Sequence, residues 1–433
     1  MHLTGVEGRK PWAFLDEYRG KFFPGQWPTL PEMFRITCHR YGERACFTIY
    51  EPDRISLNYN QAHEKIKAVA RWLHSKGIKK GDHVAVTGKN SPEWTVTYMG
   101  ILFSGATVVP LDYQLKNDET DQLLKISKTK ILFVDEEKFG YYSGGAIPLE
   151  TVVSLKQGIG TYVYDLDGPE AEIEMPVSSD TAAILFTSGT MGNPKGVMLT
   201  HENFVSDSYL AQGNLDVLHT DVFYVLLPIH HSYTMLAVLI ETLSTGAEAV
   251  FGKRMVTKAI LKDLKEAKIT MLLAVPLLYN KILSSIIRGL KEKGPVVYGI
   301  ISFLMSVSGF IKKVFKVNPG KKMFGFILDK ASLRTIRNCI SGGGPLAPSV
   351  FKKYNQLGID FVQGYGLTET SPIIALNPIQ HYKETSVGKV IPWTDMKILN
   401  PDERGVGEVI VKGPMVMKGY FEMPEETAAS FTP

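Results

Sequence analysis

Segments with helical and strand-like patterns alternate through the first two thirds of this chain. The apolar run His83–Thr87 is followed by a helical pattern that begins at Ser91 and Pro92, and then by a second apolar run at Thr107–Leu111. Serine at the N-cap and proline in the first turn are typical helix starts. Because parallel strands need a crossover connection between them, this order predicts a parallel sheet flanked by helices. The fold class indicated is α/β.

The length of 433 residues exceeds what one hydrophobic core normally holds, so we expect several subdomains. The alternation of helix and strand stops near Tyr382, where "MKILN" and "GEVIVKG" have the pattern of short strands on either side of the turn "PDERG". We therefore predict a first α/β subdomain over residues 1–180, a second over 181–381, and a small β-barrel-like subdomain over 382–433.

Composition limits the classes of protein to consider. Hydrophobic residues make up 44% of the chain and charged residues 21%, as in ordinary globular proteins. The net charge of +4 is too small to indicate nucleic-acid binding. The three cysteines suggest no disulfide framework, and the start "MHLTGVEGRKPW" has no apolar core of signal-peptide length. We therefore expect a cytoplasmic protein without a nucleic-acid partner.

One apolar segment leaves contact with a membrane open. Val296–Ile311 contains sixteen residues without a charge, and five lysines follow between Lys312 and Lys322. The run is shorter than the roughly 18 to 20 residues that a membrane-spanning helix needs. Three alternatives follow: a buried or partner-facing helix, peripheral contact of Ser302–Lys322 with the anionic inner face of a membrane, or a true span.

The stretch "FTSGTMGNPKG", Phe186–Gly196, has the composition of a phosphate-binding loop. It follows an apolar run, and it combines three glycines with hydroxyl side chains and Lys195. Glycines allow backbone N–H groups to approach an anion, and lysine adds a positive charge. The stretch is not a Walker A sequence, because Pro194 stands where that pattern requires glycine. We predict a buried strand that leads into a loop for phosphate.

This loop and four further stretches resemble, in order, the signature motifs of the adenylate-forming enzymes, the superfamily of acyl-CoA synthetases, adenylation domains and luciferases. The stretches are "TSGTMGNPKGVMLTH" (Thr187–His201), "LPIHHSYTM" (Leu227–Met235), "SGGGPLAPS" (Ser341–Ser349), "GYGLTETSP" (Gly364–Pro372) and "GEVIVKGPMVMKGYF" (Gly407–Phe421). Met191 stands where many members have threonine. The resemblance covers nearly the whole chain. It implies two stacked, mostly parallel sheets in αβαβα layers.

The resemblance implies an ATP-dependent ligase. Such enzymes join a carboxylic acid to the α-phosphate of ATP, release pyrophosphate, and then pass the acyl group to a thiol, for which coenzyme A is the default acceptor. Because the substrate carboxylate is the nucleophile, the protein needs positioning and charge neutralisation and no serine or cysteine nucleophile. The sequence agrees, since it contains no G-x-S-x-G motif. ATP, Mg²⁺ and coenzyme A are therefore the expected small-molecule partners.

The resemblance also implies the residues of the site by their place in the motifs. The expected ATP contacts are Thr187, Ser188, Gly189, Thr190, Gly192, Lys195, Gly342, Gly343, Gly344, Gln363, Gly364, Tyr365, Gly366 and Thr368. The expected acyl pocket includes His231, Tyr233, Gly342 and Gly366, and the expected catalytic residues are Thr190, Lys195, His231, Thr368 and Glu369. Glu369 and Thr190 would hold Mg²⁺, because oxygen ligands suit that hard cation. A metal site at His230 and His231 is not expected, because no third ligand lies at a matching spacing.

Three features favour a long- or medium-chain fatty acid as the substrate. "AVPLLYNKIL" (Ala274–Leu283) and the long insertion before Leu333 resemble the long-chain acyl-CoA synthetase branch, and the apolar segment would suit collection of substrate from a bilayer. Amino acids are less favoured, because Glu241 is the only acidic residue soon after the acyl-pocket motif. Aryl acids, acyl carrier protein as acceptor, a homodimer, and a non-catalytic nucleotide- or lipid-binding or membrane-docked module remain alternatives.

The end of the chain carries a further expectation. The resemblance places "EETAASFTP" before a ribose-binding aspartate and a mobile C-terminal domain of the family. We therefore expect this chain alone to bind nucleotide and fatty acid, but to be impaired in adenylation and acyl transfer.

Overall fold

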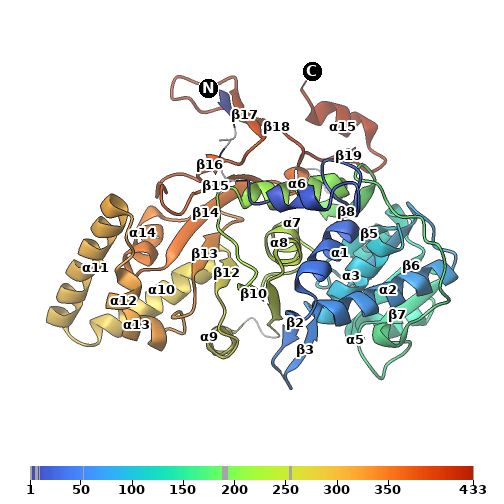
Figure 1. Cartoon of the computed structure of the whole chain (residues 1–433), viewed down its shortest axis with the longest axis horizontal. Coiled ribbons are helices and arrows are strands. Elements are labelled where there is room, and N and C mark those ends of the chain that lie inside the picture. The colour runs from blue at the N-terminus through green and yellow to red at the C-terminus, as the bar shows by residue number, and fades with distance from the viewer. Residues whose placement is uncertain are drawn as a thin grey trace.

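Two large sheets dominate the fold, with helices between them and on their outer faces (Figure 1). The computed structural model describes residues 2–4, 8, 10–51, 53–187, 194–252 and 256–432. The nine-stranded sheet has the order β16 (Lys389–Val390), β15 (Ile373–Leu376), β14 (Asp360–Gly366), β13 (Asn338–Ser341), β12 (Met271–Ala274), β10 (Val222–Val225), β11 (Glu248–Phe251), β2 (Ala45–Ile49) and β3 (Ile55–Asn58). The seven-stranded sheet has the order β19 (Gly419–Tyr420), β9 (Lys195–Thr200), β8 (Thr181–Thr187), β5 (Thr107–Leu111), β4 (His83–Thr87), β6 (Ile131–Val134) and β7 (Thr151–Ser154).

Both sheets are mostly parallel, as predicted. In the nine-stranded sheet every neighbour pair from β14 to β2 is parallel, and in the seven-stranded sheet every pair from β8 to β7 is parallel. The sheets exchange strands across residue 180, because β2 and β3 join the later sheet and β8 and β9 join the earlier one. The predicted subdomain boundary at residue 180 therefore does not coincide with a division between the sheets.

The side chains of neighbouring strand residues enter different cores, and this alternation produces the layers. In β10, Phe223 belongs to the central core and Tyr224 to the outer core of the nine-stranded sheet. In β4, Val84 belongs to the central core and Ala85 to the outer core of the seven-stranded sheet. Since successive residues of a strand point to opposite faces, both faces of each sheet are covered. The result is the predicted αβαβα order.

Three groups of helices form the helical layers. The central layer contains α1 (Leu30–Tyr41), α2 (Tyr59–Ser75), α3 (Pro92–Phe103), α6 (His201–Ala211), α7 (Ser232–Thr234) and α8 (Glu241–Thr245), with a π-helical turn at Met235–Ile240 between the last two. The outer layers contain α4 (Asn117–Ile126) and α5 (Glu136–Ser143) on one side and α9 (Thr257–Glu266), α10 (Pro276–Lys291) and α14 (Pro348–Gln356) on the other. Their starts follow local signals: the hydroxyl of Ser91 accepts a hydrogen bond from the Trp94 N–H, and Thr200 forms a capping box with Asn203.

The C-terminal region forms a smaller sheet than expected. β17 (Asp395–Leu399) and β18 (Glu408–Lys412) make the predicted antiparallel hairpin, and the N-terminal strand β1 (His2–Thr4) adds to its edge. Of the other strands in this region, β16 pairs with β15 of the nine-stranded sheet and β19 pairs with β9 of the seven-stranded sheet. A short helix, α15 (Pro424–Ser430), follows β19.

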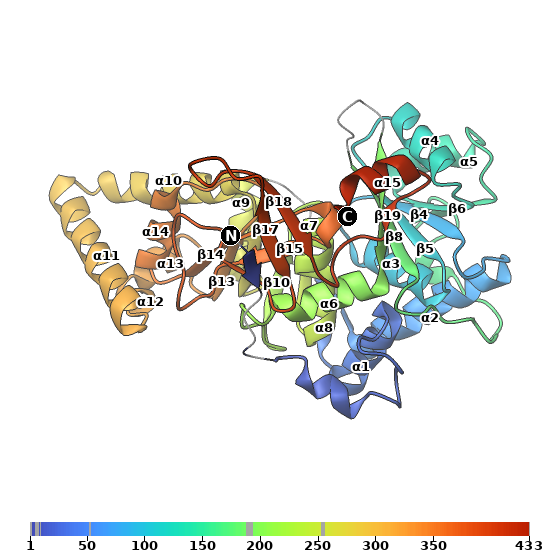
Figure 2. The same cartoon turned by 90° about the horizontal axis from the view of Figure 1, so that it is seen from above.

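The apolar segment forms a helix at one extremity of the molecule, visible in both views (Figures 1 and 2). This helix, α11 (Pro295–Phe315), follows α10 and precedes α12 (Gly320–Met323) and α13 (Gly325–Lys330). By length and composition alone this helix could cross a membrane. Only 17% of its most apolar 18-residue stretch is buried. Phe303 is 68% exposed and Phe310 63%. The alternative of a buried helix was therefore wrong.

Candidate active site

The predicted phosphate loop lies between two antiparallel strands of the seven-stranded sheet. β8 ends at Thr187 and β9 begins at Lys195, and these two residues are partners in the strand register. The hydroxyl of Thr187 donates to the Lys195 carbonyl over 3.5 Å. The other predicted contacts of this loop, Ser188, Gly189, Thr190 and Gly192, lie outside the described residues.

Lys195, Tyr420 and Glu369 form a cluster from three distant segments. The Lys195 Nζ lies 4.8 Å from the centroid of the Tyr420 ring, where the electron-rich face attracts a cation. The Tyr420 hydroxyl donates to Oε1 of Glu369 over 2.9 Å, and burial together with this bond raises the pKa of Tyr420. Tyr420 lies here because β19 pairs with β9. The hydrogen bond holds the Glu369 carboxylate close to the positive charge of Lys195.

The glycine-rich turn after β13 lies beside the last residues of β14, because Ser341 at the end of β13 pairs with Gln363, and Gly364 and Gly366 belong to β14 itself. A side chain at Gly342 would come within 2.8 Å of the Tyr233 ring, so glycine allows Tyr233 to pack against the turn. A side chain at Gly366 would lie 1.5 Å from the Pro372 carbonyl oxygen. Glycine is therefore required at both positions by close approach, and bare backbone borders the space between the loops.

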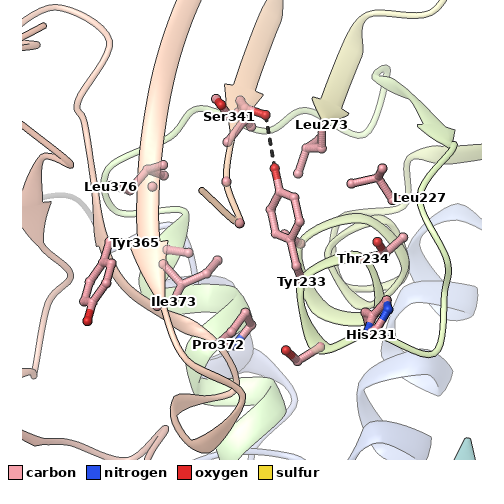
Figure 3. A pocket seen from close by; sticks show the side chains of 18 of the residues that line it. Leu227, His231, Tyr233, Thr234, Leu273, Ser341, Tyr365, Pro372, Ile373 and Leu376 are labelled. Atoms are coloured by element: carbon pink, nitrogen blue, oxygen red, sulfur yellow. Dashed lines mark hydrogen bonds between the residues drawn. The ribbon is translucent and has the colours of Figure 1, made fainter. Parts of the chain in front are cut away.

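A pocket of about 360 Å³ is lined by these glycine segments and by apolar side chains (Figure 3). The Tyr233 hydroxyl donates to the Ile340 carbonyl over 3.1 Å, which fixes the ring inside the pocket. Its apolar lining includes Ala211, Leu215, Phe223, Ala237, Leu273, Ile373 and Leu376, and its polar and glycine lining includes Ser341, Gly342, Gly343, Gly364, Tyr365, Gly366 and Thr368. A pocket with an apolar end and converging polar groups is typical of a ligand site.

Hydroxyl groups and a histidine lie where the two ends of the pocket meet. The hydroxyl oxygens of Ser232 and Thr368 are 3.2 Å apart, within hydrogen-bond distance. His231 precedes Ser232, is exposed, and lines the same pocket. These donors can reach an anionic group placed at the junction, where a carboxylate and a phosphate would meet.

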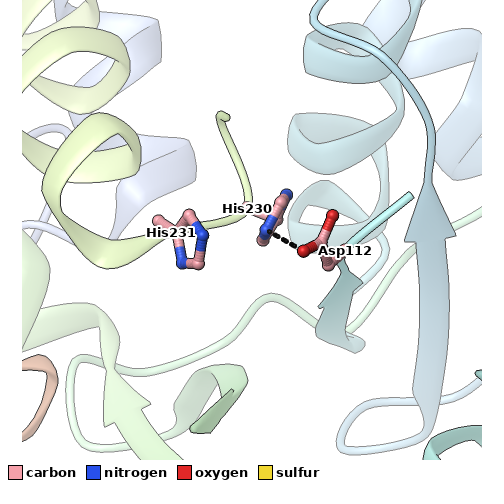
Figure 4. Close-up of side chains that lie close together, drawn as sticks. All are labelled: Asp112, His230 and His231. Carbon is pink, nitrogen blue, oxygen red and sulfur yellow. Dashed lines mark ion pairs between the residues drawn. The ribbon is translucent and has the colours of Figure 1, made fainter. Parts of the chain in front are cut away.

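Asp112, His230 and His231 converge behind this junction (Figure 4). Asp112 follows the end of β5, and its Oδ2 lies 3.6 Å from Nε2 of His230, whose ring is buried. The ligand atoms of the three residues lie within 4.8 Å of one another, so the fold supplies the third ligand that the spacing did not show. Burial and the neighbouring His231 lower the pKa of His230 to about 4, against the opposing effect of Asp112. His230 is therefore neutral near pH 7.

The structure brings together part of the predicted set. The predicted residues that line the pocket are His231, Tyr233, Gly342, Gly343, Gly364, Tyr365, Gly366 and Thr368, whereas Thr187, Lys195, Gly344, Gln363 and Glu369 lie outside its lining. Sequence reasoning gave no role to Ser232, Ser341, Phe223, Leu273, Asp112 or Tyr420. The sequence offered two signals, Tyr420 in the motif "MKGYF" and Ser232 beside the histidine pair. Nothing in the sequence shows which distant residues these two side chains contact.

Named relatives are ligases that act on carboxylic acids. The chain is 26% identical to the long-chain-fatty-acid–[acyl-carrier-protein] ligase AEE15 of Arabidopsis thaliana, over 93% of this chain and 65% of the relative. It is also 26% identical to a long-chain-fatty-acid–CoA ligase of Bacillus subtilis, over 98% of this chain and 76% of that protein. The chain thus spans less than two thirds of the length of the plant ligase.

Solved structures share the fold over nearly the whole chain. The N-terminal domain of FACL13 from Mycobacterium tuberculosis superposes with a TM-score of 0.74 at 21% identity, covering 94% of both chains. ATP-bound MatB from Rhodopseudomonas palustris superposes with a TM-score of 0.73 at 25% identity, covering 94% of this chain and 74% of that one. The family model for AMP-binding enzymes matches residues 34–421. This protein belongs to the AMP-binding enzyme family.

Proposed function

We propose that this protein activates a fatty acid by joining its carboxylate to the α-phosphate of ATP. The observation that carries the proposal is a pocket whose lining combines glycine backbone and hydroxyl groups with many apolar side chains. A carboxylate oxygen would attack the α-phosphorus, and the bond from that phosphorus to the bridging oxygen would break. Pyrophosphate leaves with the bonding electrons, so no protein nucleophile is needed.

The side chains at the junction have positioning and electrostatic roles in this proposal. Thr368 and Ser232 would donate hydrogen bonds to the α-phosphate, and His231 would lie beside the carboxylate. Donors placed where charge develops can lower a barrier by a few kcal/mol. The bare backbone at Gly342, Gly343 and Gly344 would accommodate the adenine, with Tyr365 alongside. Lys195 would neutralise phosphate charge.

The magnesium ion of the reaction would bind near Glu369. Its carboxylate oxygens fit the cation's preference, and Tyr420 fixes their position through the 2.9 Å hydrogen bond. When bound, Mg²⁺ would neutralise charge on the phosphates. Thr190, the other expected ligand, lies outside the described residues.

The choice of a fatty acid rests on the apolar end of the pocket and on the relatives. The relatives of this chain include enzymes named for long-chain fatty acids and one named feruloyl-CoA synthase, so an aryl acid is the second candidate. We propose coenzyme A as the acceptor thiol, with acyl carrier protein as the alternative that the Arabidopsis relative exemplifies.

Titration of fatty acids in the presence of ATP tests recognition of the acid, and fatty-acid-dependent exchange of pyrophosphate into ATP measures the adenylation that this chain retains. If burial in the apolar end recognises the chain, each added CH₂ should improve binding by up to about 0.8 kcal/mol until the pocket is full. Saturated acids of increasing length should therefore give a rising and then level response, and ferulate serves as the aryl comparison. A response to ferulate alone, or equal affinity from acetate to palmitate, would reject the fatty-acid proposal.

The metal role of Glu369 has its own test. Glu369→Gln should retain the fold and lose most of the Mg²⁺-dependent part of ATP binding. Tyr420→Phe, which keeps the carboxylate and removes the hydroxyl that fixes it, should show a smaller loss of the same kind. Titration of ATP with and without Mg²⁺ measures both. Equal Mg²⁺ dependence in Glu369→Gln and the parent protein would remove Glu369 from the metal site.

We also propose that the protein is cytoplasmic and attaches peripherally to the inner face of an anionic membrane through α11. Val296, Ile300, Phe303, Phe310 and Val314 are each more than half exposed on this helix. Residues 276–334 contain eleven lysines and arginines against two acidic residues, whereas the rest of the chain has an acidic excess. An exposed apolar face within a basic region favours an anionic lipid surface. The three cysteines are buried and unpaired, which fits a reducing compartment.

The attachment differs in detail from the sequence prediction, which relied on Lys312, Lys313 and Lys316. Lys312 is 6% exposed and pairs with Asp360, and Lys313 pairs with Glu384. The apolar face should therefore contribute more than these lysines.

Sedimentation with anionic and neutral vesicles tests the attachment. Phe303→Asp with Phe310→Asp should abolish binding to anionic vesicles, because each aspartate adds negative charge and removes apolar area. Val406→Asp on the β17–β18 turn is a matched control, since Val406 is also 63% exposed. Binding that survives the double substitution would exclude α11 as the contact, and a shift in oligomeric state instead would identify α11 as an interface between copies.

A further inference from the structure

A carboxyl group lies in the otherwise apolar end of the pocket. Glu241 begins α8, is 5% exposed, and lines the same cavity as Leu215 and Phe223. Among the described residues that line this cavity, no lysine or arginine accompanies it. A carboxyl group surrounded by apolar side chains is unfavourable unless its hydrogen-bonding capacity is used. The pocket therefore contains a polar group that a plain hydrocarbon chain would leave without a partner.

The protein satisfies only part of this capacity from behind the cavity. The Ser208 hydroxyl, on α6, donates to Oε2 of Glu241 over 2.7 Å, and the Gln212 amide contributes a further hydrogen bond. The next carboxyl, Asp207, is fully buried; its Oδ2 accepts from the Ile373 N–H over 2.9 Å, whereas its Oδ1 has no hydrogen-bond partner within the described part of the chain. Of these two carboxyl groups only Glu241 lines the cavity, and within the described residues no cation offsets the burial of either.

Glu241 is neutral near pH 7 in this environment. Burial raises its pKa to about 8, although the bonds from Ser208 and Gln212 act in the opposite direction. Burial raises the pKa of Asp207 well above its ordinary value, and Glu241 adds to that rise. A neutral carboxyl group can donate one hydrogen bond as well as accept others. Its natural partner is a neutral polar group such as a hydroxyl, which can both donate and accept.

The position of Glu241 along the pocket suggests where such a group would lie on a substrate. His231, Thr234, Ala237 and Glu241 all line the cavity and recur every three or four residues, so one face of this helical segment runs along the pocket. Glu241 stands ten positions after His231, at most about 15 Å along the axis at the α-helical rise. The π-helical turn at Met235–Ile240 lies between them, and such turns are frequent at functional sites.

We propose that Glu241 determines specificity by hydrogen-bonding a hydroxyl group on the acyl chain, at most about 15 Å from the substrate carboxylate. The preferred substrate would then be a hydroxylated fatty acid. This inference rests on the proposed adenylation of a fatty acid in the same pocket. A methyl group against Glu241 leaves the carboxyl unpartnered, whereas a hydroxyl of nearly equal size restores the bond.

The test compares two acids of nearly the same shape, ω-hydroxydodecanoate and tridecanoate. Their adenosine acyl-sulfamates, stable analogues of the acyl-adenylate, are titrated into the whole chain, and each free acid is assayed by pyrophosphate exchange. The parent protein should bind the hydroxyl analogue about tenfold more tightly. Because this preference is measured on the parent protein first, the result does not depend on any variant folding.

Three variants locate the preference. Glu241→Gln keeps a hydrogen-bonding group and should retain the preference for the hydroxyl analogue. Glu241→Met should abolish or reverse this preference. Asp207→Asn changes the neighbouring carboxyl, which does not line the cavity, and should leave it unchanged.

The outcomes separate this inference from the proposed function. The inference is overturned if the parent protein binds both analogues equally, or if Glu241→Met loses the same affinity for both. Glu241 would then only link α8 to α6 through its hydrogen bond with Ser208. Binding of neither acyl-sulfamate analogue, nor of any other fatty acid, rejects the proposed function itself.

Discussion

Replacing Lys312 by methionine should destabilise the protein, although the sequence places this residue in a run of apparently exposed lysines. Its Nζ lies 2.6 Å from Oδ1 of Asp360, 2.7 Å from Oδ1 of Asn355 and 3.3 Å from the Ile359 carbonyl oxygen. Burial lowers the pKa of Lys312 while Asp360 opposes the shift. Removing one partner of a buried ion pair commonly costs 3 to 5 kcal/mol. Because Asp360 is still 25% exposed, we expect the lower end, about 3 kcal/mol.

The neighbouring lysine is the matched control. Lys313 is 57% exposed and its Nζ lies 3.0 Å from Glu384, so Lys313→Met should cost at most about 0.5 kcal/mol. Urea unfolding followed by tryptophan fluorescence compares both variants. Adding Asp360→Asn to Lys312→Met should recover much of the loss, because no unpaired charge then remains. Similar stabilities for the Lys312 and Lys313 variants would refute the buried pair.

Two further predictions concern the glycines at the end of β14 and a buried histidine. Gly366→Ala should abolish nucleotide binding in a titration with ATP, because the added carbon would lie 1.5 Å from the Pro372 carbonyl oxygen. Gly364→Ala is the control: its added carbon would meet no atom closer than 3.3 Å, so this variant should bind ATP nearly normally. His201 accepts a hydrogen bond from the Leu30 N–H at Nδ1, and burial lowers its pKa to about 3. Since the pKa of His201 is lower in the folded than in the unfolded protein, the free energy of unfolding should fall as the pH drops from about 6.5 toward 3. The free energy of unfolding of His201→Gln should vary less over this range. Equal pH profiles for the variant and the parent protein would contradict this prediction.

Local signals in the sequence determined the elements and the fold class. Strand β4 spans His83–Thr87, as its apolar run predicts, and α3 begins at Pro92 behind the Ser91 cap. The glycine-rich turn after β13 also lies where its sequence indicates. These features were predictable because caps, turn residues and apolar periodicity act within a few residues of the chain. Repeated strand–helix–strand units then leave few topologies besides parallel sheets.

The tertiary structure alone decided which distant residues meet. Tyr420 reaches Glu369 because β19 pairs with β9, and Asp112 reaches His230 because β5 ends beside the loop after β10. Sheet register, and not sequence spacing, sets such contacts. For the same reason the exchange of β2 and β8 between the sheets could not be read from the chain.

The fate of the apolar segment also depended on tertiary packing. The sequence contained a charge-free run followed by lysines, which suits a buried helix and a membrane-facing helix equally well. The choice depends on which side of α11 packs against α14: Met305, Ser308 and Lys312 turn inward, and Phe303 and Phe310 remain exposed. Periodicity shows that a helix has apolar positions, but burial is a property of the neighbours that cover them.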